Sequence, residues 1–273
     1  MIKTCLFFLV LFTTHAFGQD YRAIYDLHYK RDSTSTDRIN MKMVLDIQNG
    51  DSKFFFEKLL KLDSLYKKNV QVSISIPLQQ MVKRKTGSFE NQNFVSVDES
   101  YYTFTSQDKI NWKISDSTKQ FQHYKLQKAT AYWGGRNWIA WFSSEIPISE
   151  GPYKFTGLPG LVMEISDVKN NFRYKLISLK RANETLDTKN IVESNLGLQP
   201  IKITLEKYQK LLLNRYNNPF SDYKTLEDGS WNLIIFDKKI STAAGLKDIT
   251  KEYQNDLKKK YNPLELDKKI NYK

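Results

Sequence analysis

The sequence has one cysteine, Cys5, and this residue lies in a short apolar run near the N-terminus. If that run is removed, the rest of the chain can form no disulfide and offers no thiol nucleophile or thiolate ligand. Histidine is also scarce, with three in the chain, and the motif HExxH does not occur, which excludes a Cys/His zinc site. The chain also lacks a G-x-S-x-G elbow, a P-loop and a dinucleotide fingerprint. We therefore expect no catalytic residue of these classes, no metal and no cofactor.

Residues 1–18 have the features of a secretory signal peptide. Lys3 supplies a positive start, residues 5–12 (CLFFLVLF) are apolar, and Ala16-Phe17-Gly18 is a small-x-small cleavage site. This apolar run is too short to span a bilayer, which takes about 20 residues, and no later segment is long and apolar enough. We expect residues 1–18 to be cleaved, leaving no transmembrane anchor. The remaining chain would be exported to the periplasm or the extracellular side of the outer membrane of a Gram-negative bacterium.

The composition is basic, with 42 Lys and Arg against 30 Asp and Glu and a net charge of +12. A charge of this sign favours association with an anionic membrane surface, and it would also attract nucleic acid. Export makes nucleic acid an improbable partner, so we expect none. The lysines are scattered over the chain, which is also what solubility alone would require.

Several segments alternate between apolar and polar residues, the pattern of strands with one buried face. They are residues 22–30, 41–47, 70–76 and 110–115, followed by a meander over residues 124–182 whose turns fall at Gly134-Gly135 and Asn170-Asn171. Asn49-Gly50 after the second segment indicates a tight hairpin. These patterns predict a mainly antiparallel α+β fold, built as a curved meander sheet, half-barrel or sandwich.

Helical spacing replaces the alternation in a few places. Phe55, Leu59, Leu62 and Tyr66 predict a short helix near residues 55–67. Thr204 can cap a helix that ends before Pro219, and a second C-terminal helix follows, with both ends marked by Asn and Pro. Residues 184–200 and 219–230 have the composition of polar connectors. We expect one domain over residues 19–273, with a core at 19–183 and a helical part at 201–273.

The stretch GPYKFTGLPGLVMEI, from Gly151 to Ile165, is the most distinctive part of the sequence. It resembles the signature of the GLPGLI family of secreted Bacteroidota-type proteins, with Val162 in place of the final isoleucine. The text before it, GRNWIAWFSSEIPISEGPYKF, is similar to the family as well. The resemblance implies export and a related fold, but no activity, because none is established for the family.

Local chemistry suggests how the signature folds. Pro159 suits position i+1 and Gly160 position i+2 of a type II turn, where φ must be positive, and Gly157 would let another backbone approach closely. We expect Leu158 and Leu161 to be at least partly buried. Upstream, Trp138, Ala140 and Phe142 should share one face of a strand, with Ile139 and Trp141 on the other, both faces being covered.

These residues form the candidate ligand or partner surface: Arg136, Trp138, Trp141, Glu145, Gly157, Leu158, Pro159, Gly160 and Leu161. The interpretation we favour is a non-enzymatic envelope protein that binds an apolar or amphiphilic ligand, such as a lipid, or an envelope protein partner. A carboxylate-dependent hydrolase of envelope peptides or glycans is the first alternative. It requires at least two of Glu145, Glu150, Glu164, Asp167 and Arg136 to converge in a cleft. A structural or assembly role is the second alternative.

Overall fold

The computed structural model describes residues 20–72 and 78–272. The signal peptide predicted for residues 1–18 lies outside the described residues. Most of the structure is antiparallel β, as the alternating segments predicted. The strands are β1 (Tyr21–Tyr29), β2 (Ile39–Gln48), β3 (Asp51–Phe56), β4 (Met81–Lys85), β5 (Glu90–Val97), β6 (Ser100–Gln107), β7 (Lys113–Phe121), β8 (Tyr124–Trp133), β9 (Arg136–Ser143), β10 (Leu161–Asp167), β11 (Phe172–Arg181), β12 (Ile201–Lys202), β13 (Leu233–Ile235) and β14 (Lys238–Ile240).

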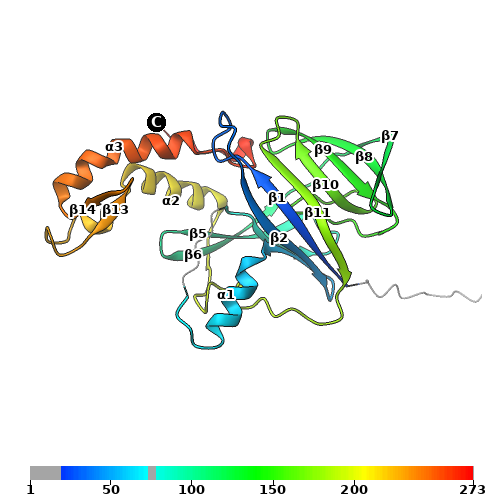
Figure 1. The fold of residues 1–273 in the computed structure, drawn as a ribbon, viewed down its shortest axis with the longest axis horizontal. Helices are drawn as coiled ribbons and strands as arrows, with labels where there is room; N and C mark the ends of the chain where they lie inside the picture. Colours follow the sequence, from blue (N-terminus) through cyan, green and yellow to red (C-terminus); the bar gives the residue numbers. More distant parts are fainter. Residues whose placement is uncertain (1–19, 73–77, 273) are drawn as a thin grey trace, which may run out of the picture.

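Twelve of these strands form one open, curved sheet in the order β12-β6-β5-β4-β3-β2-β1-β11-β10-β9-β8-β7 (Figure 1). The predicted meander is confirmed, and it forms a single sheet rather than a sandwich of two. Its tight turns lie where their residues indicated. Asn49 and Gly50 have φ of 53° and 76°, and Gly134 and Gly135 have φ of 60° and 72°, the left-handed values that favour glycine and asparagine.

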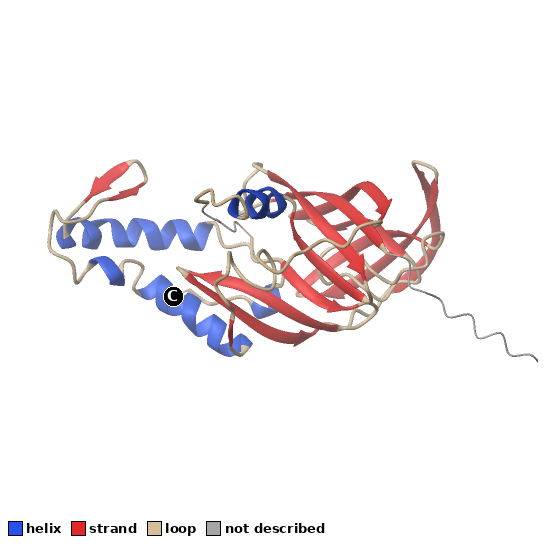
Figure 2. Cartoon of the chain, turned by 90° about the horizontal axis from the view of Figure 1, so that it is seen from below, coloured by secondary structure: helices blue, strands red, loops and turns tan. Residues whose placement is uncertain are grey.

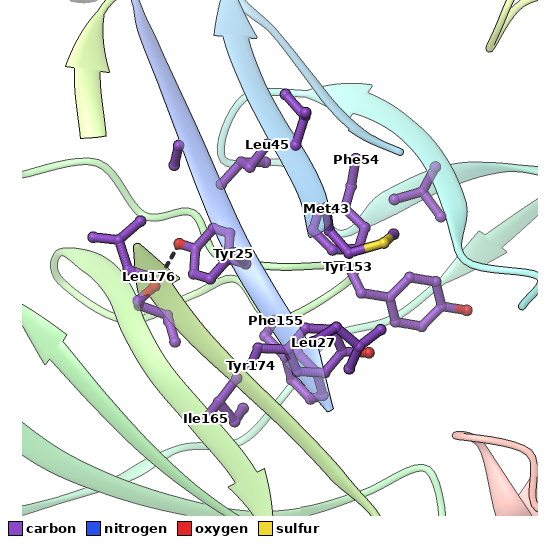
Figure 3. Packing of buried hydrophobic residues seen from close by; sticks show 14 of the residues in the cluster. Tyr25, Leu27, Met43, Leu45, Phe54, Tyr153, Phe155, Ile165, Tyr174 and Leu176 are labelled. Carbon is purple, nitrogen blue, oxygen red and sulfur yellow. Dashed lines mark hydrogen bonds between the residues drawn. The ribbon is translucent and has the colours of Figure 1, made fainter. Parts of the chain in front are cut away.

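The hydrophobic core covers one face of β1, and it extends to both faces of β2 and β3, where the consecutive residues Val44-Leu45 and Phe54-Phe55 are buried. On β1 every second residue from Tyr21 to Tyr29 is buried. Residues 151–156 lie across the same face and are buried, and Figure 3 shows Phe155 beside Leu27 and Tyr174. Aromatic rings fill this space: the ring centroid of Phe155 is 4.5 Å from that of Trp138 and 6.1 Å from that of Tyr174. An acyl chain could enter this face only by displacing these rings.

The short helix is present as α1 (Lys58–Tyr66), but its predicted first residue is wrong. Phe55 belongs to β3 and is fully buried, because strand pairing with β2 continues to Phe56. Residues 110–115 are also different from the prediction. Ile110 and Trp112 lie in a loop, and β7 begins at Lys113. In the predicted strand 70–76, residues 70–72 are not in a strand, and residues 73–77 lie outside the described part.

The segment 184–200, which was expected to be a polar connector, contributes to the core. Ile191 and Val192 are buried and join the main core, and the hydroxyl of Tyr101 donates a hydrogen bond of 2.7 Å to the carbonyl of Val192. The Nζ of Lys53 on β3 donates a hydrogen bond of 2.5 Å to the Oγ1 of Thr188, and it forms an ion pair with Glu193 at 2.7 Å. This connector therefore packs on the sheet, and its buried apolar pair is too short a run to be recognised as core from the sequence.

The C-terminal part forms an arm that extends from one end of the sheet (Figures 1 and 2). It holds α2 (Leu205–Asn217), the short 3-10 helix Ser221–Tyr223, the β13–β14 hairpin and α3 (Ala243–Lys259). Both predicted C-terminal helices are thus confirmed. The arm has its own small core, formed by Phe220, Trp231, Ile240, Leu246 and Ile249. A second 3-10 helix, Leu266–Lys268, lies near the end of the chain.

Thr204 caps α2 as its sequence position predicted. The residue is extended, and its Oγ1 accepts a hydrogen bond of 3.1 Å from the backbone N–H of Lys207. We expect Thr204→Ala to lower the stability of α2 by about 1 kcal/mol, because that N–H loses its partner. Hydrogen exchange at the first turn of α2 measures this effect. Thr225→Ala, in an exposed loop, is the control; equal exchange in the two variants would contradict the capping role.

Candidate functional site

Two hollows lined by charged and aromatic side chains lie on one face of β1 and β7–β11, the face opposite the core. We call it the polar face. It is concave where β7 curls toward β11. In a flat sheet two strands four positions apart would be separated by about 19 Å. Here Lys175 on β11 places its Nζ 5.5 Å from the ring centroid of Phe121 on β7, and Lys119 on β7 forms an ion pair with Glu164 on β10. The predicted half-barrel curvature therefore surrounds polar side chains and not the core.

A hollow of about 190 Å³ lies on this concave part. Trp141 and Ile139, both half-buried, supply its apolar wall, and the Nζ of Lys119 lies 4.5 Å from the centroid of the Trp141 ring. Glu164 and Arg173 complete the charged part of the lining. An aromatic plane beside cations can hold an apolar group and an acidic group at once. The hollow is smaller than the roughly 300–1,000 Å³ of sites that enclose drug-sized ligands, so it could enclose only part of such a ligand.

A second hollow of about 220 Å³ adjoins the first, since Asn170 and Arg173 line both. Its other lining residues are His28 and Arg38. The Nη1 of Arg38 donates a hydrogen bond of 2.8 Å to the backbone carbonyl of Asn170, which fixes the guanidinium at the rim. The two hollows form one groove, with an aromatic end at Trp141 and a basic end at His28 and Arg38.

Among the residues predicted to form a ligand surface, Trp141 alone lies in this groove. Trp138 is in the core, where its Nε1 donates to the carbonyl of Trp133 at 3.0 Å. Glu145 is exposed and lies just after the end of β9, at the open end of the β8–β9 hairpin. Its Oε1 accepts a hydrogen bond of 2.8 Å from the N–H of Lys125. The expectation that both faces of β9 are covered is also wrong, because Ile139 and Trp141 remain half-exposed.

The signature turn is a structural corner. Gly157 and Gly160 both have a positive φ, +95° and +159°, so the expectation for Gly160 is confirmed. The predicted type II turn is wrong, because the N–H of Gly160 donates to the carbonyl of Leu158 at 2.8 Å and the N–H of Leu161 donates to the carbonyl of Ile146 instead. Close approach explains Gly160: a Cβ there would lie 2.1 Å from the carbonyl oxygen of Ser143. Leu158 and Leu161 are buried as expected, while Gly157 and Pro159 are exposed.

Arg136 is buried and holds the C-terminal strap, residues 262–268, against the sheet. Its guanidinium donates 2.7–2.8 Å hydrogen bonds to the side-chain oxygen of Asn262 and to the carbonyls of Pro263 and Leu264. It also lies 3.4 Å from Asp167. Burial lowers the pKa of Arg136, and the nearby charge of Asp167 opposes that shift. Because Arg136 is buried among these contacts, it serves the fold and does not face a ligand.

A second group of buried charges fixes the same strap. Lys154 is buried and lies 3.1 Å from Asp108 and 2.8 Å from Glu265, while Lys268 lies 3.0 Å from Asp108. Burial alone would raise the pKa of Asp108, but the charges of Lys154 and Lys268 outweigh it and hold the pKa below its usual value. Burial also raises the pKa of Tyr153, whose hydroxyl donates to Glu265 at 2.8 Å. Every charge in this group has a partner in the chain, so the group stabilises the strap.

The carboxylates named for the hydrolase alternative do not share a cleft. Glu150 is buried against Arg84, Glu164 pairs with Lys119 on the polar face, and Asp167 accepts from the backbone N–H of Phe172 at 2.7 Å. Glu145 stands apart on the surface. Arg136 and Asp167 do come together, at 3.4 Å, but both are buried and bonded to other residues of the chain, so they form no cleft. An acid and a base must lie on either side of one substrate bond, and these residues do not meet that condition. In residues 20–72 and 78–272 there is also no cluster of His, Cys, Asp and Glu suited to a metal ion.

Sequence reasoning missed most of the groove. Lys119, Glu164 and Arg173 come from β7, β10 and β11, and no local pattern brings them together. The signal that could have brought these residues together was the strand register, which the turns of the meander set. The turn at Gly134-Gly135 pairs Trp141 with Lys128, and the turn at Asn170 pairs Arg173 with Ser166. Following these pairs across the sheet would have placed Trp141, Glu164 and Lys175 in one row.

Residues 135–164 match a family described as "Protein of unknown function (Porph_ging)". The matched segment runs from the turn before β9 to the middle of β10, so it contains the signature and its two flanking strands. This match fits a Bacteroidota-type family, and it does not test the narrower resemblance to GLPGLI proteins. No curated protein sequence matches the chain. In the described residues, no helix has both the length and the apolar character needed to cross a membrane.

Two solved structures of PNGF-II are similar in fold. The structure in space group C2 aligns with a TM-score of 0.53 at 14% identity, over 71% of this chain and 32% of that chain. The structure in space group P21 gives 0.52 at 14% identity, over 71% and 33%. At this identity the likeness concerns the fold alone. This chain spans about one third of the length of PNGF-II.

Proposed function

We propose that the protein is an exported, non-catalytic binding protein of the bacterial envelope. Its ligand is an amphiphile, and one end of that amphiphile lies in the groove of the polar face. The observation that carries this proposal is the position of Trp141. The half-buried indole, beside Ile139, offers an apolar surface, and Arg173, which forms no ion pair among the described residues, supplies a cation in the same small hollow. The ammonium of Lys119 at the indole is paired with Glu164.

Two features of the molecule support the polar face over the core as the place of binding. The core side is filled by the rings of Trp138, Phe155 and Tyr174, so an apolar ligand enclosed by the sheet does not fit. The net charge of +12 favours ligands that carry negative charge, including those at an anionic membrane surface. The motif-based resemblance to secreted proteins supports export, which places the ligand outside the cytoplasm.

Binding can be tested with two amphiphiles that have the same tail. Dodecyl maltoside and dodecyl phosphate, both below the concentration at which micelles form, are titrated by isothermal calorimetry. We expect both to bind, and we expect Trp141→Ala to weaken both by about tenfold, since the tail loses apolar contact with the indole and a tenfold change corresponds to about 1.4 kcal/mol.

The control is Tyr132→Ala on β8, which removes an exposed aromatic residue outside the groove and should leave both affinities unchanged. Circular dichroism verifies that the variants fold. If neither amphiphile binds the wild-type protein, or if Trp141→Ala binds as well as wild type, the proposed function is wrong. In that case capture of an envelope protein by the intact chain would be the next measurement.

A further inference from the structure

Two rows of side chains cross the polar face next to each other, and they differ in charge. The first row runs Trp141, Glu164, Lys175, Asp26 and Lys42, each residue directly opposite the next on the neighbouring strand. Its acids and bases alternate, so each charge has an opposite charge beside it. Such cross-strand pairs stabilise a sheet and leave little unbalanced charge for a ligand.

The second row is different because it contains no acid. It runs Ile139, Ser166, Arg173, His28 and Asn40. Arg173 lies directly opposite His28, so two basic side chains are cross-strand neighbours, an arrangement that is unfavourable when both are charged. Among the described residues, Arg173 forms no ion pair. This row is where the sheet has positive charge without a partner.

The other residues around Arg173 and His28 add to this excess of positive charge. Arg38, from the loop before β2, lines the same hollow and is fixed by its hydrogen bond to Asn170. Asp26, two positions before His28 on β1, has its Oδ2 2.9 Å from the Nε2 of His28 and faces Lys175 and Lys42 across the sheet. Glu164 in the adjoining hollow is paired with Lys119. Two guanidinium groups and one imidazole therefore line a hollow of about 220 Å³ with no free carboxylate in its lining.

We propose that this hollow binds a phosphomonoester group, with Arg173 and Arg38 as its principal ligands and His28 as a third donor. A phosphomonoester at neutral pH carries a charge near −2 and three acceptor oxygens, which suits a hollow lined by three basic side chains. Guanidinium groups are suited to this task, because their planar donor pairs bind phosphate oxygens in parallel. The inference rests on the proposed function and names the head group of its amphiphile, whose tail would lie toward Trp141.

The dodecyl compounds separate this inference from the proposed function. We expect wild-type protein to bind dodecyl phosphate at least tenfold more tightly than dodecyl maltoside, and also more tightly than laurate, which has the same tail length and a single negative charge. Arg173→Gln and Arg38→Gln should each weaken dodecyl phosphate about tenfold and leave dodecyl maltoside unchanged. Lys207→Gln on α2 removes the same charge from an exposed helix and should alter neither affinity.

Inorganic phosphate, added as a competitor, distinguishes a lipid head group from free phosphate. Displacement of dodecyl phosphate only at a much higher concentration of inorganic phosphate supports a lipid-type ligand. Equal affinity for the two supports the phosphate site and contradicts the amphiphile. Equal binding of dodecyl phosphate, laurate and dodecyl maltoside, or an equal loss in Lys207→Gln and Arg173→Gln, would overturn the phosphomonoester site while leaving the role of Trp141 intact.

Discussion

Replacing Arg84 by methionine should lower the free energy of unfolding by about 3–5 kcal/mol, because it leaves a carboxylate buried without its cation. Arg84 and Glu150 form an ion pair whose two side chains have no exposed surface. The Nη1 of Arg84 also donates to the carbonyl of Tyr153 at 2.6 Å, and Glu150 accepts from the N–H of Gly87 at 2.9 Å. The pair therefore joins β4 and the turn after it to the signature segment.

Urea unfolding of a matched set of variants measures this contribution. Lys85→Met, at the next position on β4, removes an exposed lysine that pairs with Asp51, and it should cost less than about 1 kcal/mol. Adding Glu150→Leu to Arg84→Met should recover part of the loss, since an apolar pair leaves no unpaired charge. A cost for Arg84→Met as small as that of Lys85→Met would show that the buried pair does not stabilise the fold.

The second large effect is expected for Gly160→Ala, at about 3 kcal/mol. Its added Cβ would lie 2.1 Å from the oxygen and 2.6 Å from the carbon of the Ser143 carbonyl. Ser143 ends β9 and pairs with Leu161 at the start of β10, so relief of the clash requires these two strands to separate. Overpacking of a well-filled site commonly costs about 1–3 kcal/mol, and a clash with backbone belongs at the upper end of that range.

Gly50→Ala provides the comparison for thermal or urea unfolding. Gly50 has a positive φ of +76°, but nothing lies within 4 Å of an added Cβ. Only the backbone preference is lost there, which amounts to about 1 kcal/mol. Equal destabilisation by the two substitutions would contradict the steric role of Gly160.

Local sequence patterns predicted most of the fold, since strands, tight turns and helix caps depend on near neighbours. The hairpin at Asn49-Gly50, the turn at Gly134-Gly135 between β8 and β9, and the cap at Thr204 are all confirmed. The failure at residues 110–115 shows the limit of such patterns. The Nε1 of Trp112 donates to the carbonyl of Thr156 at 2.8 Å, so this segment is fixed by the signature loop and not by strand pairing. Alternation alone does not distinguish the two arrangements.

The candidate site was less predictable, because long-range partners decide it. Arg136 and Glu150 looked available for chemistry, but their partners Asn262 and Arg84 lie 126 and 66 positions away in the sequence. The glycines of the signature illustrate the same point. Motif chemistry predicted the positive φ at Gly160, but not the close approach of the Ser143 carbonyl, which is set by β9 and leaves no room for a Cβ. Trp141 was identified correctly as a face residue of β9, but the cations around it come from other strands.

The C-terminal strap determines how the arm can move. The arm starts at β12, which pairs with β6, and it ends at the strap, which Arg136 and Lys154 hold to the sheet. A segment tied at both ends cannot swing outward about one hinge as a flap does. Closing this loop on folding costs conformational entropy, which the contacts at its two ends must offset. A proteolytic cut in the exposed loop at residues 224–230 would therefore leave two polypeptides that remain one particle, each anchored to the sheet by its own contacts.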